Sequence, residues 1–284
     1  MRKSGLLQWL SHIAAGITII GAPISFFILI GQDQIVTAIL AVAICLLLAL
    51  SWVLLIWREF AYSRKARFAE ATECIHQCFH NLRDAWFSML SGDSENTFKE
   101  HLLSSVKSFS SAMTLISGVH CRVCIKDIVC PDPSIEPIER ALKVETICRS
   151  EESSITDRQT QDDWISRNTD FNDLFMEPSK RFFICNDLNK LAGYQNSHWT
   201  QVTRVKKEYE YFSTIVWIVR KVFQGKVNFV ESYHPDHDCI GFLCVDSMAR
   251  GAFRRRFDVN LGMAYADALY IILKSWREKK RLVE

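Results

Sequence analysis

The eleven residues His120–Cys130, HCRVCIKDIVC, hold three cysteines and one histidine, side chains that can bind a metal or carry redox chemistry. A zinc knuckle needs its Cys-x-x-Cys pair at a tight turn, so that both thiolates point at one ion. The residues between Cys121 and Cys124 are Arg and Val, and neither favours such a turn. No second Cys-x-x-Cys follows to complete four ligands.

The same stretch alternates as a β-strand does. Cys121 and the apolar residues two and four positions further on share one side, whereas Arg122, Cys124 and Lys126 share the other. The two cysteines of the pair therefore point to opposite faces. We predict a buried strand over 121–130 that binds no metal.

Composition limits the class of protein. At 284 residues the chain has room for one or two domains, and its net charge of +2 argues against a nucleic-acid binder. The ten cysteines are scattered, and Cys45 lies inside an apolar run, which is not the pattern of a secreted disulfide framework. We read them as buried free thiols in a reducing compartment.

No set of catalytic residues stands out. The sequence contains no Gly-rich phosphate loop, no HExxH motif and no recognisable Ser-His-Asp set. The segment Tyr233–Asp238 offers two imidazoles and two carboxylates, but a polar loop between strands explains the same residues. We predict no enzyme and no metal site, and the cofactor is unknown.

Two apolar runs near the N-terminus predict a transmembrane hairpin, with spans at 13–30 and 35–57. At about 1.5 Å per residue these uncharged runs reach roughly 27 and 34 Å, enough for a hydrocarbon core of about 30 Å. Only Gly31–Gln34 separate them. A cleaved signal peptide is the alternative, and the second span that follows at once argues against it.

Lysine and arginine lie on one side of this hairpin. Arg2 and Lys3 precede the first span, Arg58 and Arg64 follow the second, and the connecting loop carries only Asp33. The positive-inside rule then places both termini in the cytoplasm. We predict an integral protein of the inner (cytoplasmic) membrane.

Residues 58–92 predict a connecting helix. Apolar residues recur there at three- and four-residue steps, in a stripe made of Phe68, Ala71, Ile75, Cys78, Leu82 and Ala85. Such a stripe suits either a dimeric coiled coil or a single helix that lies on the following domain. Both alternatives stay open, and the first implies a homodimer.

The rest of the chain, 93–284, reads as one α/β (α+β) unit. A Thr-x-x-Glu capping box at Thr97–Glu100 predicts a helix that ends near 117. We expect strands at 121–130, 141–148, 181–185, 211–223 and 238–245, a helical insert at 164–176, and a long final helix at 259–282.

The order of these elements, together with five of their sequences, resembles the GAF domain, a small-molecule-binding module of signalling proteins. The five sequences are NTDFNDLF, RFFICNDLNKL, YFSTIVWIV, CIGFLCVDS and YADALYIIL, within residues 97–280. In GAF domains a strand that ends in Asn-Asp precedes the binding helix, as Asn186-Asp187 does here, and another strand ends in Gly-x-x-x-x-Asp, as Gly241–Asp246 does. The resemblance implies an antiparallel sheet flanked by helices, with a ligand or interaction pocket.

The resemblance leaves the ligand unnamed. Asn189-Lys190 begins like the signature of the cyclic-nucleotide subclass, but the Phe and the acidic pair do not follow. The motif that surrounds the chromophore-holding cysteine of phytochrome-type domains is not found either.

In the GAF-like arrangement, ligands lie between the sheet and the helical insert. This placement implies ligand-binding residues in the insert, in the Asn-Asp turn and on the strand from 211. They are Phe171, Phe175, Asn186, Asp187, Ser213 and Trp217. The aromatic members would supply stacking or apolar walls and the polar members hydrogen bonds. The alternative for each aromatic residue is a place in the core.

Three classes of function fit these features. The first is a membrane-anchored sensor or regulator in signal transduction, in which a small ligand or partner bound by the cytoplasmic domain is coupled to the hairpin. The second is a ligand-triggered two-span membrane effector, for example in phage defence. The third is a thiol-dependent reductase, as in one GAF-related family whose cysteine spacing does not match this chain. We expect the first.

Overall fold

The computed structural model describes residues 35–130, 142–151, 164–177, 179–196, 211–221 and 239–283. The chain divides into two compact units, Met1–Arg67 and Phe68–Glu284. One helix, α2 (Ile35–Ser91), contributes to both, because it runs without a break through the predicted second span and the predicted connecting helix. The predicted first span, 13–30, lies outside the described residues.

Among the described residues, α2 is the one helix long and apolar enough to cross a membrane. Within Val42–Ser91, its most apolar 18 residues have a mean hydropathy of 2.0, and none of them is buried. These are properties of length and composition, and they match the predicted second span.

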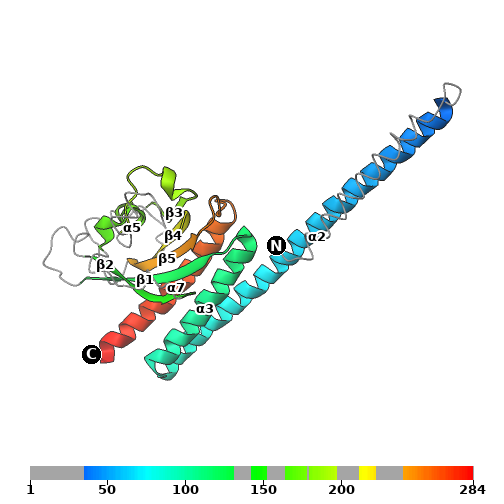
Figure 1. Ribbon diagram of the computed structural model, residues 1–284. Coiled ribbons are helices and arrows are strands. Elements are labelled where there is room, and N and C mark those ends of the chain that lie inside the picture. Colours follow the sequence, from blue (N-terminus) through cyan, green and yellow to red (C-terminus); the bar gives the residue numbers. More distant parts are fainter. Residues whose placement is uncertain are drawn as a thin grey trace. The chain divides into compact units, whose positions relative to one another are not determined.

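Five strands form one antiparallel sheet in the order β2-β1-β5-β4-β3 (Figure 1). The strands are β1 (Arg122–Val129), β2 (Lys143–Arg149), β3 (Phe182–Cys185), β4 (Ser213–Arg220) and β5 (Cys239–Ser247). The inner strands β4 and β5 are buried almost throughout. This double burial explains why their sequences read as continuous apolar runs rather than alternating ones.

Helices cover both faces of the sheet. On one face lie α3 (Glu95–Ser117) and α7 (Asp258–Val283), and on the other lies α5 (Thr169–Met176), preceded by the short η2 (Ile165–Arg167). A further short helix, η3 (Leu188–Lys190), follows β3.

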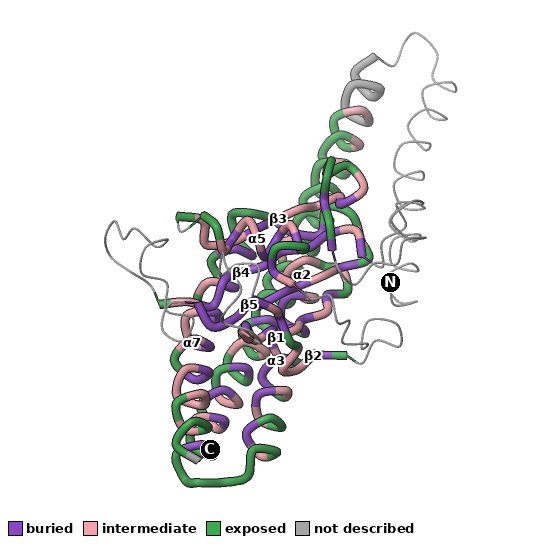
Figure 2. The backbone as a smooth tube through the Cα atoms, turned by 90° about the vertical axis from the view of Figure 1, so that its left-hand side faces the viewer, coloured by how far each residue is buried: buried purple, intermediate pink, exposed green. Residues whose placement is uncertain are grey.

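The core has one layer on each side of the sheet, and Figure 2 shows the buried backbone of the strands between them. The α7-side core includes Trp217 and Leu243 with residues of α3 and α7. The α5-side core includes Val216 and Phe242 with residues of α5.

The end of α2 packs within the second unit. Four members of the apolar stripe are buried, namely Ala71, Cys78, Leu82 and Ala85, whereas Phe68 is exposed. The Ser105 hydroxyl of α3 donates a hydrogen bond to the Cys78 carbonyl at 2.9 Å. These residues of α2 therefore pack on the domain that follows them, as the second of the two alternatives states. The homodimer stays a prediction.

The predicted fold class and the order of elements are confirmed, but the predicted helix cap is wrong. Ser94, rather than Thr97, caps α3, because the Ser94 hydroxyl accepts a hydrogen bond from the Thr97 amide at 3.2 Å. The helix therefore begins earlier, and Glu95 provides the negative charge that suits the first turn.

Candidate functional site

The strand prediction for 121–130 is confirmed. Cys121 is buried in the α7-side core, whereas Cys124 packs against the α5-side core. Among the residues that the structure describes, no group of three or more His, Cys, Asp or Glu side chains is placed to hold a metal ion. The segment Tyr233–Asp238 lies outside them.

The face of β1, β4 and β5 opposite α7 forms the floor of a cavity of about 70 Å³. Directly opposed residues of an antiparallel pair place their side chains on the same face. The register therefore lays two rows of side chains across the floor. They are Thr214–Asp246–Arg122 and Val216–Cys244–Cys124–Arg149.

The helical insert covers this floor. Asp170 and Phe171 of α5 line the cavity from above, and Asn196 and Tyr211 line it beside them. The Asn196 amide donates a hydrogen bond to the Tyr211 hydroxyl at 3.1 Å. The cavity thus lies where the GAF-like arrangement places a ligand, between sheet and insert.

A buried cation stands on the floor. Lys126 is only 5% exposed, and its Nζ lies 5.8 Å from the centre of the Phe171 ring. Arg122 and Arg149 line the same cavity. Charged groups are rarely buried without a structural or functional use, so this concentration of positive charge distinguishes the cavity from the rest of the core.

Two carboxyl groups face these cations, the buried Asp170 and the half-buried Asp246. The Asp246 carboxylate accepts a hydrogen bond from the Thr214 hydroxyl at 2.6 Å. Burial raises the pKa of Asp246, and the Thr214 hydrogen bond and the nearby positive charges oppose that rise. Asp170 accepts from the Tyr194 hydroxyl at 2.9 Å and from the Phe171 amide at 3.0 Å. Burial nevertheless raises the pKa of Asp170 to about 6.

The raised pKa of Asp170 predicts that the free energy of unfolding falls as the pH rises from about 4 to about 6. In this window the folded chain still holds a proton on Asp170, because the pKa is about 6, whereas the unfolded chain, with a pKa of about 4, has lost it. Stability from this group is full below pH 4 and falls by up to about 3 kcal/mol through pH 6. Denaturant unfolding of the full chain should show this fall, and Asp170→Asn should remove it.

The matched control for that experiment is Asp173→Asn, which changes a partly exposed carboxylate of the same helix, paired with Lys180 at 3.2 Å. The control should keep the pH dependence of the wild type. If the free energy of unfolding depends on pH in the same way in the wild type and in Asp170→Asn, the raised pKa of Asp170 is contradicted.

The two cysteines of the floor differ in their chemistry. A hydrogen bond from the Cys244 thiol lowers the pKa of Cys124, and the positive charges of Lys126 and Arg149 lower it further against the effect of burial. Burial and the neighbouring Cys124 raise the pKa of Cys244. Cys124 is therefore the thiol that ionises first.

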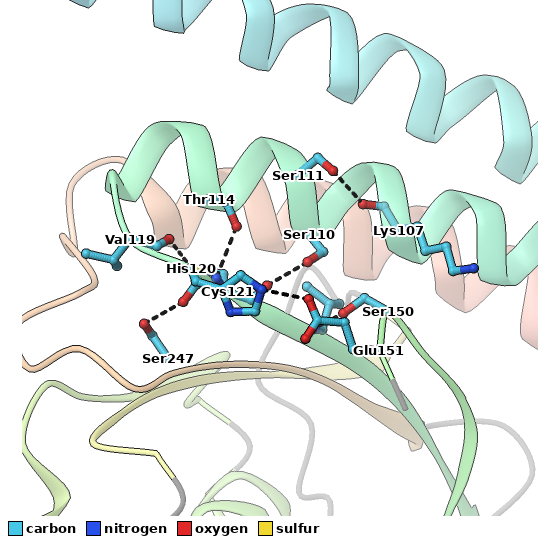
Figure 3. A network of polar contacts seen from close by, with 11 residues as sticks. Lys107, Ser110, Ser111, Thr114, Val119, His120, Cys121, Ser150, Glu151 and Ser247 are labelled. Carbon is cyan, nitrogen blue, oxygen red and sulfur yellow. Dashed lines mark hydrogen bonds and ion pairs between the residues drawn. The ribbon is translucent and has the colours of Figure 1, made fainter. Parts of the chain in front are cut away.

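Hydrogen bonds from two neighbouring elements hold the start of β1 (Figure 3). The Ser247 hydroxyl of β5 donates to the His120 carbonyl at 2.7 Å. The Ser110 hydroxyl of α3 donates to the Cys121 carbonyl at 2.6 Å. These bonds fix the phase of the strand, which decides which residues of β1 face the cavity.

The structure brings only some of the predicted ligand-binding residues to this cavity. Phe171 lines it, and Phe175 is partly buried against the same α5-side core. Trp217 lies on the opposite face, in the α7-side core, where its indole nitrogen donates to the Val259 carbonyl at 3.0 Å. A ligand-binding role for Phe171 and Phe175 stays a prediction.

The three polar members of the predicted set bind other parts of the chain. The Asn186 side chain accepts from the Phe253 amide at 2.9 Å and donates to the Phe253 carbonyl at 2.8 Å. The Ser213 hydroxyl donates to the Ala249 carbonyl at 2.7 Å. Asp187 has Arg250 Nε at 3.7 Å and Lys190 Nζ at 3.6 Å. In the structure these side chains join the turn after β3 to the chain before α7.

The polar residues of the cavity floor are not among the predicted ligand-binding residues. Arg122, Cys124 and Lys126 alternate along β1, and a polar face on a strand covered on both sides is a usable signal. The partners Cys244 and Asp246 on β5 carry no such signal, because their strand reads as apolar on both faces.

Comparisons with known proteins give a fold likeness only. No protein-family model and no curated protein matches the chain. Among solved structures, the chromophore-binding domain of an unusual bacteriophytochrome from R. palustris shares 10% identity, with a TM-score of 0.40 over 70% of this chain and 62% of that one. This chain therefore spans less than two thirds of that structure's length.

Two further structures are similar to the chain. A phycoerythrobilin-bound GAF domain from a cyanobacterial phytochrome shares 12% identity, with a TM-score of 0.39 over 71% of this chain and 97% of that one. A far-red absorbing dark state with bound biliverdin IXa shares 15% identity, with a TM-score of 0.34 over 68% and 97%. In this chain, the five-stranded antiparallel sheet with helices on both faces is the architecture that the sequence resemblance implies, and the fold is GAF-like.

Proposed function

We propose that this protein is a membrane-anchored cytoplasmic sensor or regulator whose GAF-like domain binds a small ligand in the cavity between the sheet and α5. The observation that carries the proposal is the convergence of three charged side chains on one cavity, namely Lys126 and Asp170, which are buried, and Asp246, which is half-buried. A cavity with a few convergent polar groups and shifted pKa values is the usual form of a ligand site.

The size and charge of the cavity support a particular class of ligand. Its volume of about 70 Å³ is well below the roughly 300–1,000 Å³ of sites that bury drug-sized ligands. Positive charge from the arginines and Lys126 suits an anionic group, and Asp246 suits a hydrogen-bond donor. We propose a small anionic metabolite that also carries a donor.

The membrane part of the proposal rests on α2 and on the sequence that precedes it. The exposed apolar stretch of α2 supports one span, and the uncharged run at 13–30 supports a second. Charge placement on either side of the two runs supports cytoplasmic termini. In this proposal α2 is the link between ligand binding and the membrane.

A thermal titration of the full chain in detergent tests ligand binding. We expect at least one member of a panel of small carboxylates, phosphates and zwitterionic metabolites to raise the melting temperature. At a hundred times the dissociation constant the rise should be roughly 5–10 °C. Lys126→Met should abolish the rise, because it removes the buried cation but keeps most of the side-chain volume.

The control is Lys190→Met, which changes a lysine whose side chain is 83% exposed. This variant should keep the ligand-induced rise. The comparison uses the rise within each variant, so a change in basal stability does not enter. A panel in which nothing stabilises the wild type, or a rise that survives in Lys126→Met, would contradict the proposed function.

A further inference from the structure

Cys124 and Cys244 are directly opposed on the neighbouring strands β1 and β5, in a register that runs without a shift from Arg122 to Asp127. Opposed residues of an antiparallel pair have Cα atoms about 4.5 or 5.5 Å apart, depending on the pair type. Disulfides span Cα distances of about 4.4–6.8 Å. Either pair type therefore brings the two cysteines within disulfide range.

The neighbouring cysteines are not placed in this way. Cys121 points to the α7-side core. Cys148 lies opposite Ile125 and packs against the same α7-side core. Among the described residues that line the cavity, Cys124 and Cys244 are the two thiols. Strand pairing therefore places these two thiols, among those of the described residues that line the cavity, next to each other.

Both thiols line the cavity, so a small oxidant that enters it meets them together. The reactive form of a cysteine is the thiolate, and positive neighbours stabilise it. Lys126 and Arg149 supply that charge beside Cys124. A volume of about 70 Å³ holds a few water-sized molecules, which is enough for hydrogen peroxide.

We propose that Cys124 and Cys244 are a redox-active pair that hydrogen peroxide converts into a reversible disulfide across the cavity floor. The Cys124 thiolate attacks one peroxide oxygen, so that an S–O bond forms and the O–O bond breaks. The hydroxide that leaves takes up the proton lost by Cys124 and departs as water. Cys124 is then a sulfenic acid.

The Cys244 thiol completes the reaction. Its sulfur attacks the sulfenic sulfur, the S–S bond forms, and the sulfenic hydroxyl leaves as a second water with the Cys244 proton. Two electrons pass from the two sulfurs to the peroxide, and a thiol reductant returns them. This reaction goes beyond the proposed function, because it needs no bound ligand.

The bond alters the cavity that it crosses. Opposed Cβ atoms in a sheet are about 4.5–5.5 Å apart, whereas a disulfide holds them at about 3.5–4.5 Å. Closing the bond therefore draws β1 and β5 together at the Cys124–Cys244 pair. This pair lies between the opposed pairs Arg122–Asp246 and Lys126–Phe242. A disulfide formed against such resistance is readily reduced, as a regulatory one must be.

Peptide mapping of the full chain in detergent tests the proposal. The reduced protein is treated with a small excess of hydrogen peroxide, its free thiols are blocked with N-ethylmaleimide, and it is digested with trypsin. Cleavage after Arg122 and Lys126 isolates Cys124 in the peptide VCIK. We expect free thiols to fall from ten to eight per chain and VCIK to be linked to the peptide that contains Cys244.

That second peptide also contains Cys239, so fragment ions must place the link, and Cys239→Ser should retain it. Cys244→Ser should stop the reaction at the sulfenic acid, which dimedone traps on Cys124. Cys121→Ser, on the opposite face, should leave the link unchanged. Ten free thiols after treatment, or a link from Cys124 to any other cysteine, would overturn the proposal, and neither result depends on a variant that must fold.

Discussion

Replacing Gly262 by alanine is expected to destabilise the domain by about 3 kcal/mol or more. In an exposed helix the same change stabilises by about 1 kcal/mol. Here a Cβ atom on Gly262 of α7 would stand 2.1 Å from two carbons of the Trp217 indole and 2.6 Å from a third. At this position Gly→Ala is therefore expected to destabilise the domain, whereas in an exposed helix it stabilises.

The indole has no room to move away. Trp217 is fully buried in the centre of β4, and its nitrogen donates to the Val259 carbonyl one turn before the glycine. Relief therefore requires α7 to shift from the sheet, which opens the α7-side core. Asn260→Ala, at an exposed position of the same helix, is the matched control and should be nearly neutral.

Denaturant unfolding of the full chain measures the effect on the second unit. The double variant Gly262→Ala, Trp217→Phe should recover part of the loss, because the smaller ring lacks the carbons that meet the new methyl group. A single Gly262→Ala variant as stable as the wild type would show that the contact between α7 and β4 is looser than described.

The Arg277→Met variant is expected to lose about 3–5 kcal/mol. Arg277 Nη2 of α7 contacts the Asp127 carboxylate, and lies 2.7 Å from the Ile128 carbonyl and 2.8 Å from the Ile240 carbonyl. The Arg277 and Asp127 side chains are only 15% and 16% exposed. Burial raises the pKa of Asp127, and Arg277 opposes that rise. Removing the guanidinium leaves a buried carboxylate and two carbonyls without this donor.

The pH dependence of this loss separates charge from packing. Without Arg277 the pKa of Asp127 rises further, so protonation at low pH relieves the penalty. The deficit of Arg277→Met relative to the wild type should therefore be smaller at pH 4 than at pH 7. Arg83→Met, which breaks an exposed pair with Asp84, should cost no more than about 1 kcal/mol at either pH. An equal deficit at both pH values would assign the effect to packing alone.

The fold could be predicted because its signals are local. The apolar runs of β4 and β5 and the periodic apolar residues of the long α7 each lie within one element. The phase of β4 could not be predicted in the same way. Its residues are apolar on both faces, so nothing in the strand says that Val216 rather than Trp217 faces α5.

The candidate site is harder to predict because it depends on pairing over a long distance. Arg122, Cys124 and Lys126 alternate visibly along β1. Their partners on β5 depend on the register between two segments more than a hundred residues apart. Nothing in the sequence of either strand indicates that register. The resemblance of the sequence to GAF domains implied that Phe171 lies between the sheet and the helical insert, but it implied nothing about the polar rows of the floor.

The central place of β5 has a consequence for how the chain matures during synthesis. β5 lies between β1 and β4 but is the last strand to be made. The ribosome adds about 5–20 residues per second, so β1 waits roughly 6–24 seconds for its inner neighbour. Until then the emerging protein holds two half-sheets with open edges, which are prone to pair with other chains. A nascent chain that stops before β5 has no cavity floor, so the site arises in a single late step of biogenesis.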